Sequence, residues 1–184
     1  MIVAVIPAKK DSSRLPNKNM QLLNGKPMIH YSLKLAQASQ YVEKIYVSTD
    51  SDEIAAYAKK NNVDVIMRGK ELGGETPIVE VYLDALKVLD DSSIKYIVGL
   101  QPDHPDRRIK LDEAIAYLIE KDSDELISVD GEGLVNGSLK IMKTEALLAG
   151  RIGAISTIMD DCTNIHYMDD LKRAESKLVM MESQ

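Results

Sequence analysis

Short runs of β-branched residues alternate along this chain with longer segments of helical period, and this alternation constrains the fold more than any other feature. Alternation of this kind is typical of βαβ units, in which helices cover a parallel sheet. We therefore expect an α/β fold, a three-layer α/β/α sandwich with a mostly parallel sheet. The predicted strands cover residues 2–6, 44–48, 63–66, 95–100, 125–129, 138–142 and 153–158. The predicted helices cover residues 27–39, 51–61, 77–89, 110–121 and 168–180.

Composition narrows the class of protein. The chain has 184 residues, of which 45% are hydrophobic and 28% charged, and we expect residues 1–184 to form a single domain because domains of this size are common. Cys162 is the only cysteine, which excludes an internal disulfide and a cysteine zinc cluster. The net charge of −6 and the absence of Phe and Trp argue against nucleic-acid partners. No apolar run approaches the ~20 residues of a membrane span, and Met1 leads directly into a strand, so we expect a cytoplasmic protein without a membrane partner.

A basic loop follows the first predicted strand. Residues 7–19 contain four basic side chains and one acidic side chain. In open α/β sheets ligands bind beyond the carboxyl ends of the strands, and Lys, Arg and Ser at such a place suit a polyphosphate. A solvated basic loop is the alternative, and charge alone does not decide between the two. Neither the Gly-x4-Gly-Lys-Ser/Thr phosphate loop nor the Gly-x-Gly-x2-Gly dinucleotide motif is present.

The order of residues in this loop is more informative than its charge. It resembles the amino-terminal signature of the nucleotide-sugar cytidylyltransferases, above all the acylneuraminate cytidylyltransferases, or CMP-sialic acid synthetases. That family usually has Arg in place of Lys9, a change that keeps the charge and loses the guanidinium fork. The matching residues are Ile6-Pro7-Ala8-Lys9, Ser13-Arg14, Pro16, Lys18-Asn19 and Gly25-Lys26-Pro27-Met28-Ile29.

Further blocks similar to this family follow in order, so that the resemblance extends from residue 2 to residue 176. The family inserts an extended segment between the positions of Val129 and Asn136, which covers the acceptor and builds the dimer, whereas only six residues stand there in this chain. The resemblance therefore implies a short member in which a homodimer is possible but the family's dimer element is missing. The further blocks are Val47-Ser48-Thr49-Asp50-Ser51-Asp52-Glu53-Ile54-Ala55, Arg68 with Glu71-Leu72 and Thr76-Pro77, Leu100-Gln101-Pro102, Asn136-Gly137-Ser138-Leu139 and Asp169-Asp170-Leu171-Lys172-Arg173-Ala174-Glu175.

The resemblance implies a Rossmann-like nucleotidyltransferase sheet and an enzyme that moves CMP from CTP to an acidic sugar or similar small anionic acceptor, releasing pyrophosphate. Its catalytic residues would be Lys9, Lys18 and Asp103, with both lysines on the CTP phosphates. Two alternatives stay open: a nucleotidyltransferase for another nucleotide or for a phosphate or phosphonate acceptor, and a catalytically weakened nucleotide-binding protein. The nucleotide-binding residues implied are Pro7, Ala8, Lys9, Ser13, Arg14, Lys18, Asn19 and Arg68. The acceptor-binding residues implied are Gln101, Arg107 and Asn136.

At the expected metal site the sequence differs from that of the sialic acid enzymes. In-line attack on a phosphate requires charge neutralisation, which Mg²⁺ supplies when one or two protein oxygens and the nucleotide phosphates hold it. The sialic acid enzymes carry an Asp-x-Asp pair where this chain has Asn164-Ile165-His166. Asp103 instead resembles the metal-binding Asp in the Gly-Asp-x-Pro motif of the sugar-phosphate nucleotidyltransferases, and Asn164 resembles their late Asn. We therefore expect Asp103 and Asn164 to hold Mg²⁺ with His166 beside them; the alternatives are a turn acid and a structural histidine.

Two further features predict no site. The acidic pairs Asp90-Asp91 and Asp160-Asp161 are typical of solvated loops. Cys162 has no His or Asp partner at motif spacing, so we assign it no nucleophilic role.

Overall fold

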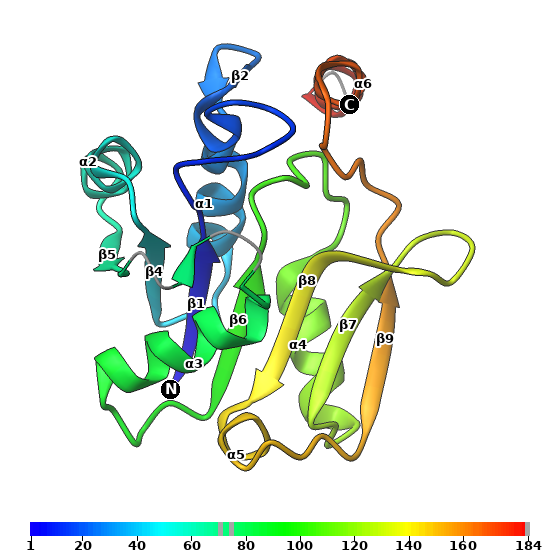
Figure 1. Ribbon diagram of the computed structural model, residues 1–184. Coiled ribbons are helices and arrows are strands. Elements are labelled where there is room, and N and C mark those ends of the chain that lie inside the picture. The colour runs from blue at the N-terminus through cyan, green and yellow to red at the C-terminus, as the bar shows by residue number, and fades with distance from the viewer. Residues whose placement is uncertain (70–71, 74–75, 183–184) are drawn as a thin grey trace.

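A seven-stranded sheet forms the centre of the computed structural model, which describes residues 1–69, 72–73 and 76–182. The strand order is β5-β4-β1-β6-β8-β7-β9 (Figure 1). All neighbouring pairs are parallel except those of β8, which runs antiparallel to β6 and β7. The mostly parallel sheet predicted from the sequence is confirmed. The strands are β1 (Ile2–Pro7), β4 (Lys44–Thr49), β5 (Asp64–Met67), β6 (Tyr96–Leu100), β7 (Glu125–Val129), β8 (Val135–Lys143) and β9 (Ile155–Met159).

Helices cover both faces of the sheet, as the predicted three layers require (Figure 1). One face packs against α1 (Ile29–Ala38), α2 (Asp52–Lys60) and α4 (Leu111–Glu120). The other packs against α3 (Ile78–Leu89) and the short α5 (Thr144–Leu148), which the sequence pattern did not predict. Coverage on both sides explains why every residue of β1 is buried and why that strand is uniformly apolar. In the described ranges no helix combines the length and apolarity needed to cross a bilayer.

Local chemistry sets the start of α2. Ser51 adopts an extended backbone and its hydroxyl accepts a hydrogen bond from the Ile54 amide, while Asp52 and Glu53 lie in the first turn. A polar cap and acidic residues at a helix amino end stabilise it through the free amides and the helix dipole. The amino-terminal cap of α2 is therefore Ser51.

A small hairpin separates the basic loop from α1. Its strands are β2 (Leu22–Leu23) and β3 (Lys26–Pro27), and they follow a single 3-10 turn, η1 (Lys18–Met20). Asn24 and Gly25 between them both have positive φ angles, of 47° and 72°, a pairing that Asn-Gly adopts readily in tight hairpins. The helix predicted from residue 27 therefore begins two residues later, because Pro27 belongs to the hairpin.

The last helix, α6 (Met168–Glu182), packs on this hairpin and not on the sheet. Leu171, Ala174 and Leu178 join Leu15 of the basic loop in a separate buried cluster. The end of the chain thereby supports the loop that follows the first strand. The other members of the cluster are Leu23, Met28 and Ile165.

Gly99 in β6 faces the ring of Tyr82 from α3, a tyrosine that is only 1% exposed. A Cβ atom at Gly99 would overlap the Tyr82 ring and hydroxyl. We expect Gly99→Ala to lower the free energy of unfolding by about 1–3 kcal/mol, since a buried overlap forces strain. Denaturant unfolding measures this, with Gly131→Ala as the control because a Cβ there meets no atom within 4 Å. Equal stability of the two variants would contradict the close packing of α3 on β6.

Candidate active site

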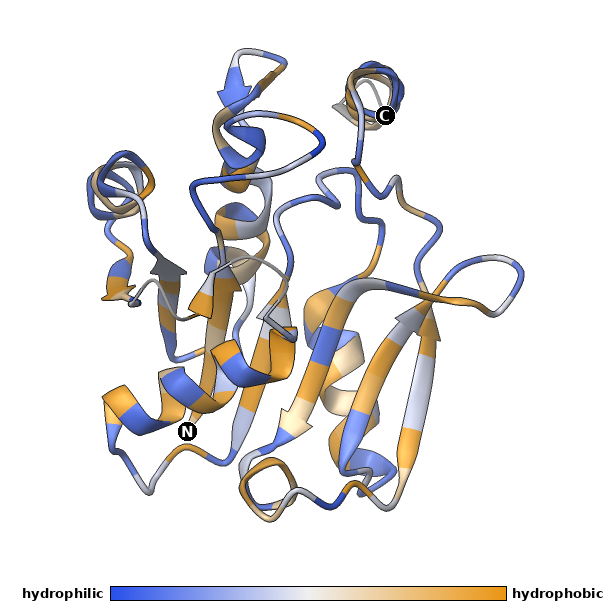
Figure 2. Ribbon diagram, in the orientation of Figure 1, coloured by the Kyte–Doolittle hydropathy of each residue, from blue (hydrophilic) through white to orange (hydrophobic). Residues whose placement is uncertain are grey.

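A cavity of about 360 Å³ opens at the carboxyl ends of β1 and β6. The loop after β1, mostly hydrophilic in Figure 2, forms one wall. Of the eight residues predicted to bind nucleotide, all but Ala8 line this cavity; Ala8 is buried in the sheet, where its amide donates to the Ser48 carbonyl. The lining residues are Pro7, Lys9, Ser12, Ser13, Arg14, Lys18, Asn19, Arg68, Leu72, Thr76, Ile78, Val81, Gln101, Pro102, Asp103 and His166.

Lys18 and Asp103 form the polar centre of the cavity. The Lys18 Nζ atom lies 2.6 Å from Oδ2 of Asp103 and donates a second hydrogen bond of 3.1 Å to the Ile165 carbonyl. Nδ1 of His104, a side chain that is only 2% exposed, lies 3.0 Å from the other carboxylate oxygen. Burial alone would raise the pKa of Asp103, but His104 and Lys18 outweigh it and hold that pKa well below its ordinary value. The cavity therefore contains a carboxylate that is ionised at neutral pH.

Arg14 connects the basic loop to the segment before α6. Its Nη1 atom lies 2.9 Å from Nδ1 of His166, and because a guanidinium only donates, the histidine nitrogen accepts. Burial, together with the charges of Arg14 and Lys18, lowers the pKa of His166. The side chain of Asp170 in turn accepts from the His166 amide at 3.0 Å. His166 is thus a neutral ring that orients Arg14 at the cavity.

Arg68 brings a second guanidinium to the cavity from the end of β5. It is 9% exposed, and its Nε atom is buried without a hydrogen-bond partner in the described part of the chain. Burial lowers the pKa of Arg68, and the charges of Asp50 and Asp84 partly offset this. A buried donor without a partner costs free energy, so this atom is suited to bind an acceptor group on a ligand.

Asn19 shapes the loop. Its side-chain Nδ2 donates to the Lys9 carbonyl at 2.9 Å, and the residue is 6% exposed. The loop is held again where the Lys10 amide donates to Asp50 at 2.7 Å. Two hydrogen bonds therefore hold the backbone at Lys9, one at its own carbonyl and one at the amide of the next residue.

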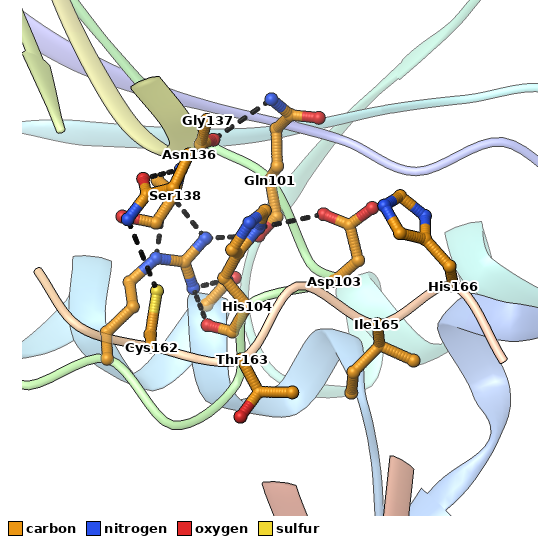
Figure 3. A network of polar contacts seen from close by, with 12 residues as sticks. Gln101, Asp103, His104, Asn136, Gly137, Ser138, Cys162, Thr163, Ile165 and His166 are labelled. Atoms are coloured by element: carbon orange, nitrogen blue, oxygen red, sulfur yellow. Dashed lines mark hydrogen bonds and ion pairs between the residues drawn. The ribbon is translucent and has the colours of Figure 1, made fainter. Parts of the chain in front are cut away.

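Gln101 presents an oxygen to the cavity. Its Nε2 atom donates to the Gly137 carbonyl at 2.9 Å, and a carbonyl only accepts, so the orientation of the amide is fixed. Figure 3 shows the amide oxygen directed away from Gly137. The residue can therefore accept a hydrogen bond from a ligand hydroxyl.

Arg107 does not reach the cavity, which corrects its prediction as an acceptor-binding residue. It is 8% exposed, and its guanidinium donates five hydrogen bonds within the protein. The acceptors are the carbonyls of Gln101, His104 and Ser138 and the hydroxyl of Ser32. Since a guanidinium has only five N–H groups, none remains for a substrate. Through these hydrogen bonds Arg107 instead connects the loop after β6 to β8.

Asn136 is likewise committed to the protein. Its Oδ1 atom accepts from the Ser128 hydroxyl at 2.6 Å and the Ser138 amide at 3.0 Å, while its Nδ2 atom donates to the Asp160 carbonyl at 2.6 Å. The predicted role in acceptor binding is therefore wrong for this conformation. Figure 3 shows Asn136 beside Gly137 and Ser138, away from Asp103.

Asp160 is also structural, contrary to the expectation of a solvated loop. It is 2% exposed and accepts from the Arg108 amide and the Ser138 hydroxyl at 3.0 and 2.7 Å. Asp90, Asp91 and Asp161 are exposed, as expected. Burial, with the charge of Asp160, raises the pKa of the Cys162 thiol to about 12, which agrees with the absence of a nucleophilic role.

The oxygen atoms beside Lys18 suit Mg²⁺. Asp103 supplies a carboxylate, and Oδ1 of Asn164 is buried without a hydrogen-bond partner among the described residues. The Ile165 amide donates to the Asp103 carbonyl at 2.9 Å, which brings residues 164–166 beside Asp103. Across the described ranges no three His, Cys, Asp or Glu side chains could hold a metal together. Two oxygen donors fit Mg²⁺ shared with phosphates, whereas His166 has its Nδ1 occupied by Arg14.

Six lining residues stand outside the predicted sets of nucleotide, acceptor and metal ligands. Ser12 belongs to the basic loop whose serines were expected to suit a polyphosphate, and Pro102 lies between two predicted residues. Ile78 and Val81 occupy the first turn of α3 and form an apolar wall. The sequence feature that could have indicated them is their position just after Thr76-Pro77, near the edge of the sheet where the strands end. Leu72 and Thr76 complete the set; Glu71, from the same block, lies outside the described residues.

A basic cavity with an ionised carboxylate, at the carboxyl edge of a sheet covered on both faces, defines an α/β protein built to bind an anionic ligand at the ends of its strands. The sequence identifies the class more closely. The family model described as cytidylyltransferase matches residues 3–181, so the chain belongs to the cytidylyltransferase family.

Sequence relatives carry related names. The chain is 36% identical over 97 residues to the 3-deoxy-manno-octulosonate cytidylyltransferase 2 of Hydrogenovibrio crunogenus, a match covering 53% of this chain and 39% of that protein. It is 36% identical over 123 residues to the CMP-N,N'-diacetyllegionaminic acid synthase of Legionella pneumophila, covering 65% and 52%. These matches span about half or less of the relatives' own lengths.

Solved structures share the fold over a longer span. A CMP:2-keto-3-deoxy-manno-octonic acid synthetase complexed with CTP superposes with a TM-score of 0.78 and 15% identity, covering 100% of this chain and 99% of that one. A cytidylyltransferase from Leptospira borgpetersenii gives a TM-score of 0.75 at 19% identity, covering 99% and 92%. At these identities the likeness establishes the fold.

Proposed function

We propose that this chain transfers CMP from CTP to a sugar acid, with release of pyrophosphate and dependence on Mg²⁺. The observation that carries the proposal is the convergence of Lys9, Arg14, Lys18 and Asp103 on one cavity at the carboxyl ends of the strands. Family membership and relatives named for CMP-sugar acid synthesis support the same reaction.

At the α-phosphorus the proposed reaction forms one bond to oxygen and breaks another. An acceptor hydroxyl oxygen attacks the α-phosphorus of CTP, the bond from that phosphorus to the bridging oxygen breaks, and pyrophosphate leaves with the electron pair while the hydroxyl proton passes to water. Little covalent chemistry is asked of the protein, so alignment and charge neutralisation dominate. Lys9, Arg14 and Lys18 would hold the triphosphate, and the fixed ring of His166 keeps Arg14 aimed at it.

Asp103 and Asn164 would hold Mg²⁺ together with the phosphates, and the ion would supply charge neutralisation at the leaving group. Arg68 would donate a hydrogen bond to the nucleotide through its Nε atom, which has no partner among the described residues. The side-chain oxygen of Gln101 faces the cavity and would accept a hydrogen bond from a hydroxyl group of the sugar acid.

Pyrophosphate release tests the proposal. The purified chain is incubated with CTP, UTP, GTP or ATP, with and without Mg²⁺, and with 3-deoxy-manno-octulosonate, N-acylneuraminate or diacetyllegionaminate as acceptor. We expect release with CTP, Mg²⁺ and one of these sugar acids, and the largest rise in melting midpoint with CTP, since a ligand stabilises the state that binds it. A midpoint raised by CTP without pyrophosphate release from any acceptor would instead support a catalytically weakened nucleotide-binding protein. A preference for another nucleotide would exclude cytidylyl transfer.

Substitution of Gln101 tests acceptor recognition. Gln101→Glu removes the donor to Gly137 and places a negative charge near an anionic acceptor, so we expect the acceptor KM to rise roughly tenfold or more with CTP binding unchanged. Steady-state kinetics at saturating CTP measure this. The matched control is Gln37→Glu, because Nε2 of Gln37 also donates to a backbone carbonyl, that of Asn61 at 2.8 Å, outside the cavity. An unchanged acceptor KM would remove Gln101 from the acceptor site.

A further inference from the structure

The Lys18 ammonium group lies between the two chain segments that carry the proposed cation ligands. It contacts Oδ2 of Asp103, in the loop after β6, and the carbonyl oxygen of Ile165, in the segment before α6. Asn164, the second proposed ligand, directly precedes Ile165. The Ile165 amide also donates to the Asp103 carbonyl at 2.9 Å, which holds the two segments side by side. Lys18 therefore joins the same two segments that a bound cation would join.

The two carboxylate oxygens of Asp103 have different surroundings. Oδ1 is buried and lies 3.0 Å from Nδ1 of His104, whose side chain is only 2% exposed (Figure 3). Oδ2 is the oxygen that lies 2.6 Å from the Lys18 ammonium. Because His104 lies against Oδ1, the carboxylate offers Oδ2 to a cation. The oxygen that a cation needs is therefore the one that Lys18 already contacts.

Two positive charges do not share this carboxylate without repulsion. The side chains of Lys18 and Asp103 are 15% and 16% exposed, so water screens the repulsion between an ammonium group and a divalent cation only weakly. A lysine has a flexible stem of four carbons, so its Nζ atom can leave one anion for another within reach. Lys18 lines the cavity together with Lys9 and Arg14, where the phosphates of a nucleotide would supply that second anion.

We propose that Lys18 and a divalent cation are alternative partners of Oδ2 of Asp103, and that the triphosphate decides between them. This rests on the proposed function, because it takes Asp103 and Asn164 as cation ligands and CTP as the substrate. Without nucleotide, Lys18 neutralises the carboxylate and keeps a cation out. When the phosphates bind, Lys18 moves to them and Asp103 becomes available to the cation. The nucleotide and the cation therefore strengthen each other's binding.

The alternative is that Lys18 stays on Asp103 when the nucleotide binds, and removal of the lysine charge distinguishes the two arrangements. If Lys18 moves to the phosphates, Lys18→Met opens the cation site only in the nucleotide-free protein, so the coupling between cation and nucleotide falls. If Lys18 stays on Asp103, the same substitution strengthens cation binding equally with and without nucleotide, and the coupling is unchanged.

The experiment uses Mn²⁺, an ion that takes oxygen ligands as Mg²⁺ does and whose unbound fraction is measured by electron paramagnetic resonance. In the nucleotide-free protein we expect Lys18→Met to lower the Mn²⁺ dissociation constant roughly tenfold. Calorimetric titration with CTP, once in EDTA and once in saturating Mn²⁺, gives two CTP dissociation constants whose ratio measures the coupling. We expect that ratio to fall by a similar factor in Lys18→Met. Association of Mn²⁺ with free CTP is the same for every variant and cancels in the comparison.

Arg14→Met is the matched control. It removes the same charge from the same cavity, but the Arg14 guanidinium contacts the ring of His166. Both readouts should stay within about threefold of the parent. An unchanged coupling ratio in Lys18→Met would overturn the proposal, as would equal effects of Lys18→Met and Arg14→Met. Circular dichroism verifies the folding of each variant, and Lys18→Gln, which is polar and uncharged, should repeat the result of Lys18→Met.

A double variant separates this proposal from the proposed function. Lys18→Met with Asp103→Asn should lose the gained Mn²⁺ affinity, and retained affinity would overturn the proposal because the cation would then lie away from Asp103. The pyrophosphate assay of the parent protein tests the transfer reaction independently. Pyrophosphate release with an unchanged coupling ratio would overturn only the exchange at Asp103. A lowered coupling ratio without pyrophosphate release would support the exchange and overturn the transfer reaction.

Discussion

Replacing Asp103 by Asn is expected to slow pyrophosphate release by about 10²–10³-fold, the scale of losing one electrostatic element of a transition-state site, while CTP still binds. The amide is close in shape to the carboxylate but cannot neutralise Lys18, which lies 2.6 Å away, and it would leave Mg²⁺ without an anionic protein ligand. CTP binding is expected to hold or strengthen, because the change removes a negative charge from a cavity that we propose receives a triphosphate. Single-turnover rates at a series of Mg²⁺ concentrations, with CTP affinity from melting shifts, measure both effects.

The matched control for this change is Asp11→Asn. Asp11 is an exposed carboxylate in the same basic loop and does not line the cavity, so its removal alters local charge without touching the site. We expect rates within a few-fold of the parent. Retention of a Mg²⁺-dependent rate in Asp103→Asn would assign the metal to other residues.

Replacing Arg107 by Met is expected to lower the free energy of unfolding by about 3–5 kcal/mol, which is the cost of removing one member of a buried charged network. The change leaves the carbonyls of Gln101, His104 and Ser138 buried without their donor. Domains of this size are stable by only about 5–15 kcal/mol, so the variant is expected to be close to unfolding at 37 °C. Denaturant unfolding monitored by circular dichroism measures the loss.

The adjacent Arg108 offers the control. It is exposed, and Arg108→Met removes the same charge from the same loop. We expect a change within about 0.5 kcal/mol, as is usual for surface substitutions. Equal losses at both positions would mean that net charge, and not the five hydrogen bonds of Arg107, stabilises the loop.

The spacing of hydrophobic residues along the chain was enough to predict most of the architecture. Buried parallel strands are uniformly apolar and their helices are amphipathic, so β1 and α4 are visible in the sequence. The basic loop was also recognisable, because its residues are consecutive and most of them reach the cavity directly from one backbone segment. Six predicted nucleotide ligands of this loop line that cavity, and Arg68 joins them from the end of β5. The connection between β7 and β8 is short, as the spacing from Val129 to Asn136 indicated.

The residues that sequence reasoning placed wrongly share a physical cause. Arg107, Asn136 and Asp160 are polar side chains that satisfy backbone groups from distant parts of the chain. Whether such a side chain faces solvent or the interior depends on contacts that no local pattern encodes. The 3-10 turn, the hairpin and α5 were missed because each is too short to show a period.

The packing of α6 on the hairpin sets an order on folding. Arg14 and His166 are 152 positions apart, and Lys18 and Ile165 are 147 apart, yet both pairs are bonded at the cavity. During synthesis the strands β1, β4 and β6 can pair while the basic loop still lacks its partners, since these become available only after β9 has been made. We therefore expect a nascent chain to acquire a sheet well before it acquires the proposed triphosphate site, and a ribosome-bound chain truncated before residue 160 to fold without binding the nucleotide.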